Sequence, residues 1–283
     1  MSYPPGSPPP YPEETPAQPE PRMVRVRQRI QRPLVVYILL GLTILVYLLQ
    51  EMTKAGIARE PFLLLGQLLM GEDIFQFLLA EAGTRDLLIL LGGKNSSLIV
   101  LGQYWRLITP VVLHASLAHI GFNMYALFAI GPALEAHYGH WRFLALYLLG
   151  AVGGNVLSFY MTPNWSVGAS TAIFGLVAAQ GVFIYQNRRL FGKQARAMLN
   201  NVFFIVGVNL LLGLSGGIDN WGHLGGLLAG LAYAWFAGPI LGVDMNQPVP
   251  ELSDQRSEGT AWMVAAVVAF VLAALALVRI NTY

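Results

Sequence analysis

Residues 34–50 read LVVYILLGLTILVYLLQ, an apolar run without a single charged side chain. A helix of about 20 apolar residues spans the roughly 30 Å hydrocarbon core of a bilayer. Comparable segments follow at 115–136, 142–162, 170–187, 198–214, 220–241 and 261–280. Because lipid offers the backbone no hydrogen-bond partner, such runs adopt helices. The sequence therefore predicts an all-α polytopic membrane protein with seven spanning helices.

The composition of the whole chain supports this fold class. The 283 residues are 55% hydrophobic and only 11% charged, whereas soluble globular proteins have about 25% charged residues. A net charge of +2, with scattered basic residues, excludes a nucleic-acid partner. The absence of cysteine excludes disulfides, thiolate metal sites and cysteine nucleophiles. The functions that remain are those of membrane proteins.

Composition also divides the chain into segments. Residues 1–33 are rich in proline and then in arginine, cannot bury enough apolar surface to fold, and are predicted to form a disordered cytoplasmic tail without a signal peptide. Residues 34–241 contain six of the spans, with a long loop at 51–114 whose short apolar stretches are expected to lie at the membrane interface. Residues 242–260 are predicted to be a cytoplasmic linker, and residues 261–283 the seventh helix with a short tail.

The distribution of Lys and Arg predicts the orientation. With the N-terminus in the cytoplasm, eleven of the 17 basic residues lie inside and six outside. The loop 187–196, with four positive charges, is the strongest local signal for the inner side. We therefore expect the N-terminus inside, in a multi-pass protein that by default belongs to a bacterial plasma membrane.

Polar side chains gather at the starts of three spans. The second span begins with His114, His119 and Asn123, the fourth with Gly168 and Ser170, and the sixth with His223. In the predicted orientation all three spans enter the membrane from the outer face, so the three clusters lie at a similar depth. Ionisable and amide groups are costly inside a membrane and are functional candidates by default.

Spacing predicts which helix faces meet. His223, Gly226 and Gly230 are separated by three and four residues and lie on one stripe of a helix. Glycines at such intervals allow close helix contact in lipid, and Ala172, Gly175 and Ala179 offer a matching face on the fourth span. A serine and an imidazole brought together in this way can form a nucleophile and its general base. Gly-x-Ser at the start of a helix leaves backbone N–H groups free for an oxyanion, and His119 and Asn123 could donate to the same oxyanion.

These motifs together resemble the rhomboid family of intramembrane serine proteases. The resemblance covers roughly residues 34–241 and rests on motifs that occur in the family's order. They are His114-x4-His119-x3-Asn123, Gly168-x-Ser170, His223-x2-Gly226-x3-Gly230, and Trp105-Arg106 in the first loop. The resemblance implies a six-helix bundle plus one extra C-terminal transmembrane helix.

The resemblance also implies site roles. Ser170 would be the nucleophile and His223 its base, while His119, Asn123 and the Ser170 N–H would form the oxyanion hole. Gly168, His114, Phe174, Gly226 and Gly230 would support the site. The partners would be single-span or polytopic membrane protein substrates within the lipid bilayer, with no nucleic acid. No metal and no cofactor would be needed.

One residue departs from the family pattern. The family usually has glycine directly after the serine, and this chain has Thr171. A β-branched residue excludes positive φ, so either the backbone is ordinary helix at this position or the oxyanion geometry differs. We expect the helix, because residues 172–180 have an unbroken helical pattern.

Other interpretations carry less support from the residues. Asp219 lies one turn before His223, but its place at the mouth of the span predicts a helix cap and not a third catalytic residue. No zinc motif of the His-Glu-x-x-His type occurs, and no span centre carries an aspartate. The alternative function is that of a catalytically inactive rhomboid-like protein that binds or escorts membrane clients. A transporter is disfavoured because no internal repeat is visible.

Overall fold

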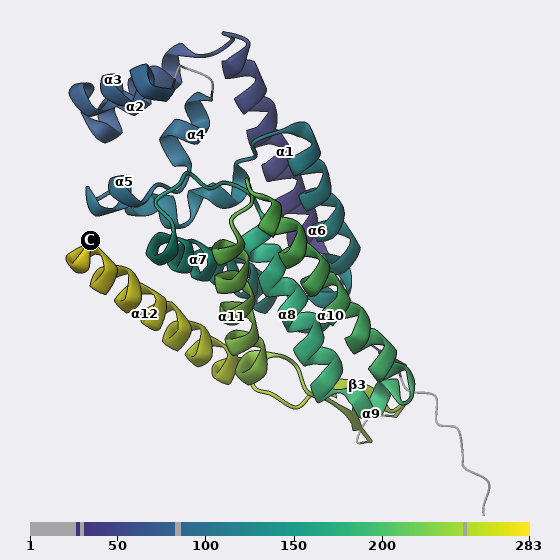
Figure 1. The fold of residues 1–283 in the computed structure, drawn as a ribbon. Coiled ribbons are helices and arrows are strands. Elements are labelled where there is room, and N and C mark those ends of the chain that lie inside the picture. The colour runs from purple at the N-terminus through teal and green to yellow at the C-terminus, as the bar shows by residue number, and fades with distance from the viewer. Residues whose placement is uncertain (1–26, 29–30, 83–85, 246–247) are drawn as a thin grey trace, which may run out of the picture.

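The fold was analysed in a computed structural model, which describes residues 27–28, 31–82, 86–245 and 248–283. Figure 1 shows a bundle of long helices with a loop domain at one end and a small sheet at the other. All seven predicted spans are helical, and the predicted fold class is confirmed. The helices are α1 (Leu34–Lys54), α6 (Leu117–Tyr138), α7 (His140–Met161), α8 (Ser170–Gln186), α10 (Gln194–Leu212), α11 (Asn220–Ala237) and α12 (Glu258–Thr282).

The spanning helices differ in how well they suit a membrane on their own. Five of them, α1, α6, α7, α10 and α12, are long and apolar enough to cross it by length and composition. In contrast, α8 has 17 residues, and α11 has 18 residues that include Asn220 and His223. Most of α8 is buried against other helices. The two helices that carry the candidate site are therefore the ones that do not meet the length and composition of a membrane span on their own.

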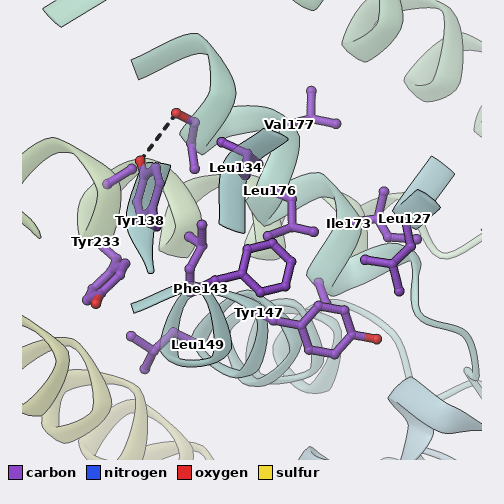
Figure 2. Close-up of a cluster of buried hydrophobic side chains, with 14 of the residues drawn as sticks. Leu127, Leu134, Tyr138, Phe143, Tyr147, Leu149, Ile173, Leu176, Val177 and Tyr233 are labelled. Atoms are coloured by element: carbon purple, nitrogen blue, oxygen red, sulfur yellow. Dashed lines mark hydrogen bonds between the residues drawn. The ribbon is translucent and has the colours of Figure 1, made fainter. Parts of the chain in front are cut away.

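The core lies around α7 and α8. Apolar side chains gain little from moving between lipid and a protein interior, so close packing must hold these helices together. Phe143, Tyr147 and Leu176 are at most 1% exposed, and Figure 2 shows them side by side. The Tyr138 hydroxyl of α6 donates a hydrogen bond to the Ala179 carbonyl of α8 over 3.4 Å. Aromatic packing and a buried hydrogen bond thus join α6, α7 and α8.

Glycine allows α7, α8 and α11 to touch through their backbones. A Cβ on Gly226 would lie 2.0 Å from the Thr171 carbonyl oxygen, and one on Gly230 would lie 2.4 Å from Gly175. On the neighbouring face of α11, a Cβ on Gly225 would lie 2.4 Å from the Gly153 carbonyl oxygen of α7. The predicted glycine stripe on α11 is confirmed as the surface that packs on α8.

The long loop between α1 and α6 is a folded unit. Its six short helices are α2 (Glu60–Met70), α3 (Glu72–Ala82), α4 (Leu87–Gly92), α5 (Ser96–Val100), η1 (Tyr104–Leu107) and η2 (Thr109–Val112). Arg106 is fully buried and donates to the carbonyls of Gly93 and Leu90 and to the Gln103 side chain. The Trp105 indole donates to the Leu91 carbonyl. The Trp-Arg pair therefore holds the loop's own backbone together.

The opposite end of the bundle carries a three-stranded sheet in the order β1-β3-β2. It contains β1 (Arg27–Gln28), β2 (Leu241–Asp244) and β3 (Glu251–Asp254), and α9 (Arg188–Phe191) lies nearby in Figure 1. These segments lie in the predicted tail and around the predicted linker, and the sequence pattern did not predict the sheet. The rest of the predicted disordered tail, residues 1–26 and 29–30, lies outside the described residues.

Candidate active site

Ser170 and His223 face each other where α8 and α11 meet. Ser170 is the first residue of α8, and His223 lies in the first turn of α11. The distance from Ser170 Oγ to His223 Nε2 is 2.9 Å, which is a hydrogen bond. The glycine contacts described above bring the two helices close enough for this bond. An imidazole nitrogen in this place can take the serine proton.

The His223 ring is held by an aromatic stack. Phe174 of α8 lies parallel to it, with ring centroids 4.2 Å apart and planes at 11°. Among the described residues, no hydrogen-bond partner reaches His223 Nδ1. Asp219 caps α11 by accepting the Gly222 N–H at 2.9 Å, and its other oxygen bonds the Ser158 hydroxyl. The predicted capping role of Asp219 is confirmed, and among the described residues the imidazole bonds Ser170 and no third side chain.

Gly168 brings a further imidazole to the serine. Its φ of +128° is a conformation that side-chain-bearing residues rarely adopt, and a Cβ there would lie 2.7 Å from His119 Nε2. The same Cβ position is 3.7 Å from Ser170 Oγ. The Ala115 N–H donates to His119 Nδ1 at 3.4 Å, which leaves Nε2 as the nitrogen that carries a proton. His119 thus presents a donor close to the nucleophile.

Asn123 and His114 lie on either side of this donor. The Asn123 amide donates to the His119 carbonyl at 2.9 Å, one turn back on α6. His114 is fully buried, its ring touches the edge of the His119 ring at 5.0 Å, and its Nε2 accepts the Ala169 N–H. Burial, together with His119, lowers the pKa of His114 to about 3. His114 therefore positions the turn before the serine as a neutral ring.

Thr171 fits an ordinary helical position. The α8 helix begins at Ser170, and Ala58 is the single non-glycine with positive φ among the described residues. The Thr171 side chain fills the space beside Gly154. A Cβ added to Gly154 would lie 2.5 Å from the Cβ of Thr171. Its hydroxyl is buried and has no partner among the described residues. The expectation of helix at this position is confirmed.

A buried polar network supports the turn before Ser170, and sequence reasoning missed it. Lys94 is fully buried, and its ammonium donates to the carbonyls of Ser158, Thr162 and Asn164. Burial lowers the pKa of Lys94 to about 8, against the opposing effect of the Asp219 charge. The Lys94 backbone also exchanges two hydrogen bonds with Ser166. Because most of the partners are backbone carbonyls, no residue pattern could have indicated them.

Comparisons with known proteins agree with this geometry. A family model described as "Rhomboid domain" matches residues 101–240. The chain is 37% identical over 199 residues to "Rhomboid protease GluP" of Bacillus subtilis (strain 168). The matched region covers 69% of this chain and 38% of the relative. It is 35% identical over 182 residues to "Rhomboid-like protease 1" of Toxoplasma gondii, covering 58% of this chain and 62% of the relative.

A third relative is "RHOMBOID-like protein 9, chloroplastic" of Arabidopsis thaliana, 35% identical over 160 residues, covering 56% of this chain and 37% of the relative. The chain thus spans between about a third and two thirds of the length of these relatives. The matched region contains His114, His119, Asn123, Ser170 and His223. From the helical bundle, the paired serine and histidine, and these relatives, we conclude that the chain belongs to the rhomboid family.

Proposed function

We propose that this protein is an intramembrane serine endopeptidase that cleaves transmembrane substrates through a Ser170–His223 dyad. The observation that carries the proposal is the 2.9 Å contact between Ser170 Oγ and His223 Nε2. Nucleophilic catalysis requires a base within this distance of the hydroxyl. His223 would take the proton as Ser170 attacks the carbonyl and return it to the leaving amine.

The oxyanion would be bound by donors at the start of α8. Because α8 begins at Ser170, the first N–H groups of this helix have no partner within the helix and can bind a negative charge. His119 Nε2 lies against Gly168 and supplies a side-chain donor on the same side. The second Asn123 amide hydrogen would contribute a further donor, since the first is used by the His119 carbonyl. Such donors stabilise the charge that develops in the transition state.

The substrates would be single-span or polytopic membrane proteins. A helical substrate hides its peptide bonds in its own hydrogen bonds, so it would need to unwind locally, which favours sites rich in glycine or other poor helix formers. We further propose, from the positive-inside count, that the N-terminus is cytoplasmic and that the dyad opens to the outer face.

Fluorophosphonate labelling of the purified full chain tests the assignment. Ser170 should be labelled in the wild type, and Ser170→Ala and His223→Ala should each lose both labelling and cleavage of a transmembrane reporter. Ser97→Ala, which changes an exposed loop serine, is the matched control and should behave as wild type. If folded wild-type protein neither labels nor cleaves, the alternative of an inactive, client-binding member is favoured. Residual cleavage above a tenth of wild type in Ser170→Ala would contradict the dyad.

A further inference from the structure

An apolar groove lies between the C-terminal helix and the core, away from the candidate dyad. It has a volume of about 730 Å³ and is lined by residues of α7, α11 and α12. Every lining side chain is aliphatic, aromatic, methionine or glycine, and the one hydroxyl, on Tyr160, is used by the Leu275 carbonyl at 2.6 Å. Leu228 and Val267 on the groove walls are 50% and 57% exposed, so the groove is accessible from outside. Any group that enters the groove must therefore be apolar.

The helix α12 is fastened to the core at both ends of this groove. At the sheet end, Arg142 pairs with Asp254, and Arg256 donates to the Gly238 carbonyl at 2.6 Å. At the loop end, the Tyr283 hydroxyl lies 3.3 Å from Ser97 of α5, and Figure 1 shows the C-terminus beside that helix. These contacts hold the two ends of α12 against the core, and the groove lies between them.

The length of the groove fits one acyl chain better than a transmembrane helix. The lining of α12 runs from Met263 to Leu275, about 18 Å at 1.5 Å per residue. This is close to the depth of one leaflet, about 15 Å. A helix that spans the hydrocarbon core is about 30 Å long, so a groove of this length matches one leaflet and not the full thickness of the bilayer.

A positive charge marks one end of the groove. Arg279 follows Leu275 by one turn, and its guanidinium lies 5.6 Å from the Tyr160 ring and 4.8 Å from the Tyr283 ring. Stacking occupies the faces of a guanidinium, and Arg279 Nε donates to the Phe159 carbonyl at 3.5 Å, so the terminal nitrogens remain for an anion. Among the described residues, no carboxylate pairs with Arg279, whereas Arg142 at the other end pairs with Asp254. The complementary ligand carries a negative group at the Arg279 end.

We propose that the groove binds a membrane phospholipid, with an acyl chain between α7, α11 and α12 and the phosphate on Arg279. Phosphate suits the bidentate geometry of arginine, and the position of Arg279 near the end of α12 places it at headgroup depth. The bound chain would supply the packing between α12 and the core that the protein's own side chains leave out. This inference does not depend on proteolytic activity.

Native mass spectrometry of the delipidated full chain in detergent tests the site. We expect wild type to retain one added phosphatidylglycerol. Arg279→Gln should weaken that binding at least about tenfold, because a charge-assisted bond is lost. Binding of diacylglycerol, which lacks the phosphate, should not respond to Arg279→Gln. Val267→Trp should fill the groove and abolish the binding of both lipids.

Matched controls separate the site from general lipid contact. Arg188→Gln removes another arginine stacked on a tyrosine, and Val278→Trp enlarges an exposed α12 residue outside the groove; both should bind as wild type. If Val267→Trp fails to fold, Leu228→Trp makes the same test from the opposite wall. Equal retention in all variants would overturn the proposal in favour of ordinary annular lipid. A photocrosslinker at Leu228 that captures protein and no lipid would overturn it in favour of a helix-binding surface.

Discussion

Replacing Thr171 by glycine, the residue usual in the family at this position, tests how the serine turn works. The Thr171 side chain is 4% exposed by residue and fills the space beside Gly154. Removing its methyl and methine groups opens a void that costs about 2 kcal/mol, and glycine in a helix adds about 0.5 kcal/mol. Removing the unpartnered hydroxyl returns about 1 kcal/mol. We expect a net loss of about 1–2 kcal/mol.

The readout is thermal unfolding and turnover of a transmembrane reporter, measured on the same preparation. A loss of this size should lower the melting temperature by about 2–8 °C in a chain of this length. Turnover should stay flat or fall, because the backbone at Thr171 is already helical and gains nothing from added freedom. Thr171→Val is the control: it keeps the volume, replaces the unpartnered hydroxyl by a methyl group, and should raise stability by about 1 kcal/mol. A clear rise in turnover with Thr171→Gly would refute this reasoning.

Further predictions concern the donor, the orientation, a buried histidine and the glycine contact. His119→Ala should reduce turnover about 10²–10³-fold with folding intact, and an effect on KM alone would argue against an oxyanion donor. In whole cells, an impermeant thiol reagent should label Ser97→Cys and spare Lys193→Cys, and the reverse pattern would invert the proposed topology. Between pH 6.5 and 3, His114 is neutral in the folded protein and protonated in the unfolded chain, because its pKa is lowered from 6.5 to about 3 on folding. The free energy of unfolding should therefore fall as the pH is lowered through this range, by about 2 kcal/mol at pH 5. That loss should be absent in His114→Asn, and an unchanged pH profile would contradict it. Gly226→Ala should prevent stable folding, since its Cβ would lie 2.0 Å from a backbone oxygen; a stable variant with wild-type activity would show that α11 can shift.

The sequence predicted the parts of this protein that depend on local pattern. Apolar runs predicted every long helix to within a few residues, because a membrane fixes both helix length and character. The spacing of His223, Gly226 and Gly230 predicted the contact with α8, since glycines three and four apart mark one face.

What sequence reasoning missed depends on backbone partners and on long-range pairing. Lys94 binds carbonyl oxygens, which every residue possesses, so its role left no trace in the residue types. The sheet joins Arg27–Gln28 to Glu251–Asp254, more than 220 residues away, through strands too short to show an alternating pattern. The Trp105-Arg106 motif marked Arg106 in the sequence, but the loop carbonyls that Arg106 binds carry no sequence signal.

The place of α8 and α11 in the chain has a consequence for biogenesis. These two helices are the ones that fall outside the set able to cross a bilayer by length and composition, and they carry Ser170 and His223. During synthesis α11 follows α8, and α11 both packs against Gly175 of α8 and carries the His223 imidazole. In the proposed mechanism Ser170 therefore has no base until the ribosome has passed residue 237, the end of α11. A chain truncated before α11 would keep the serine but would lack the partner that the proposed dyad requires.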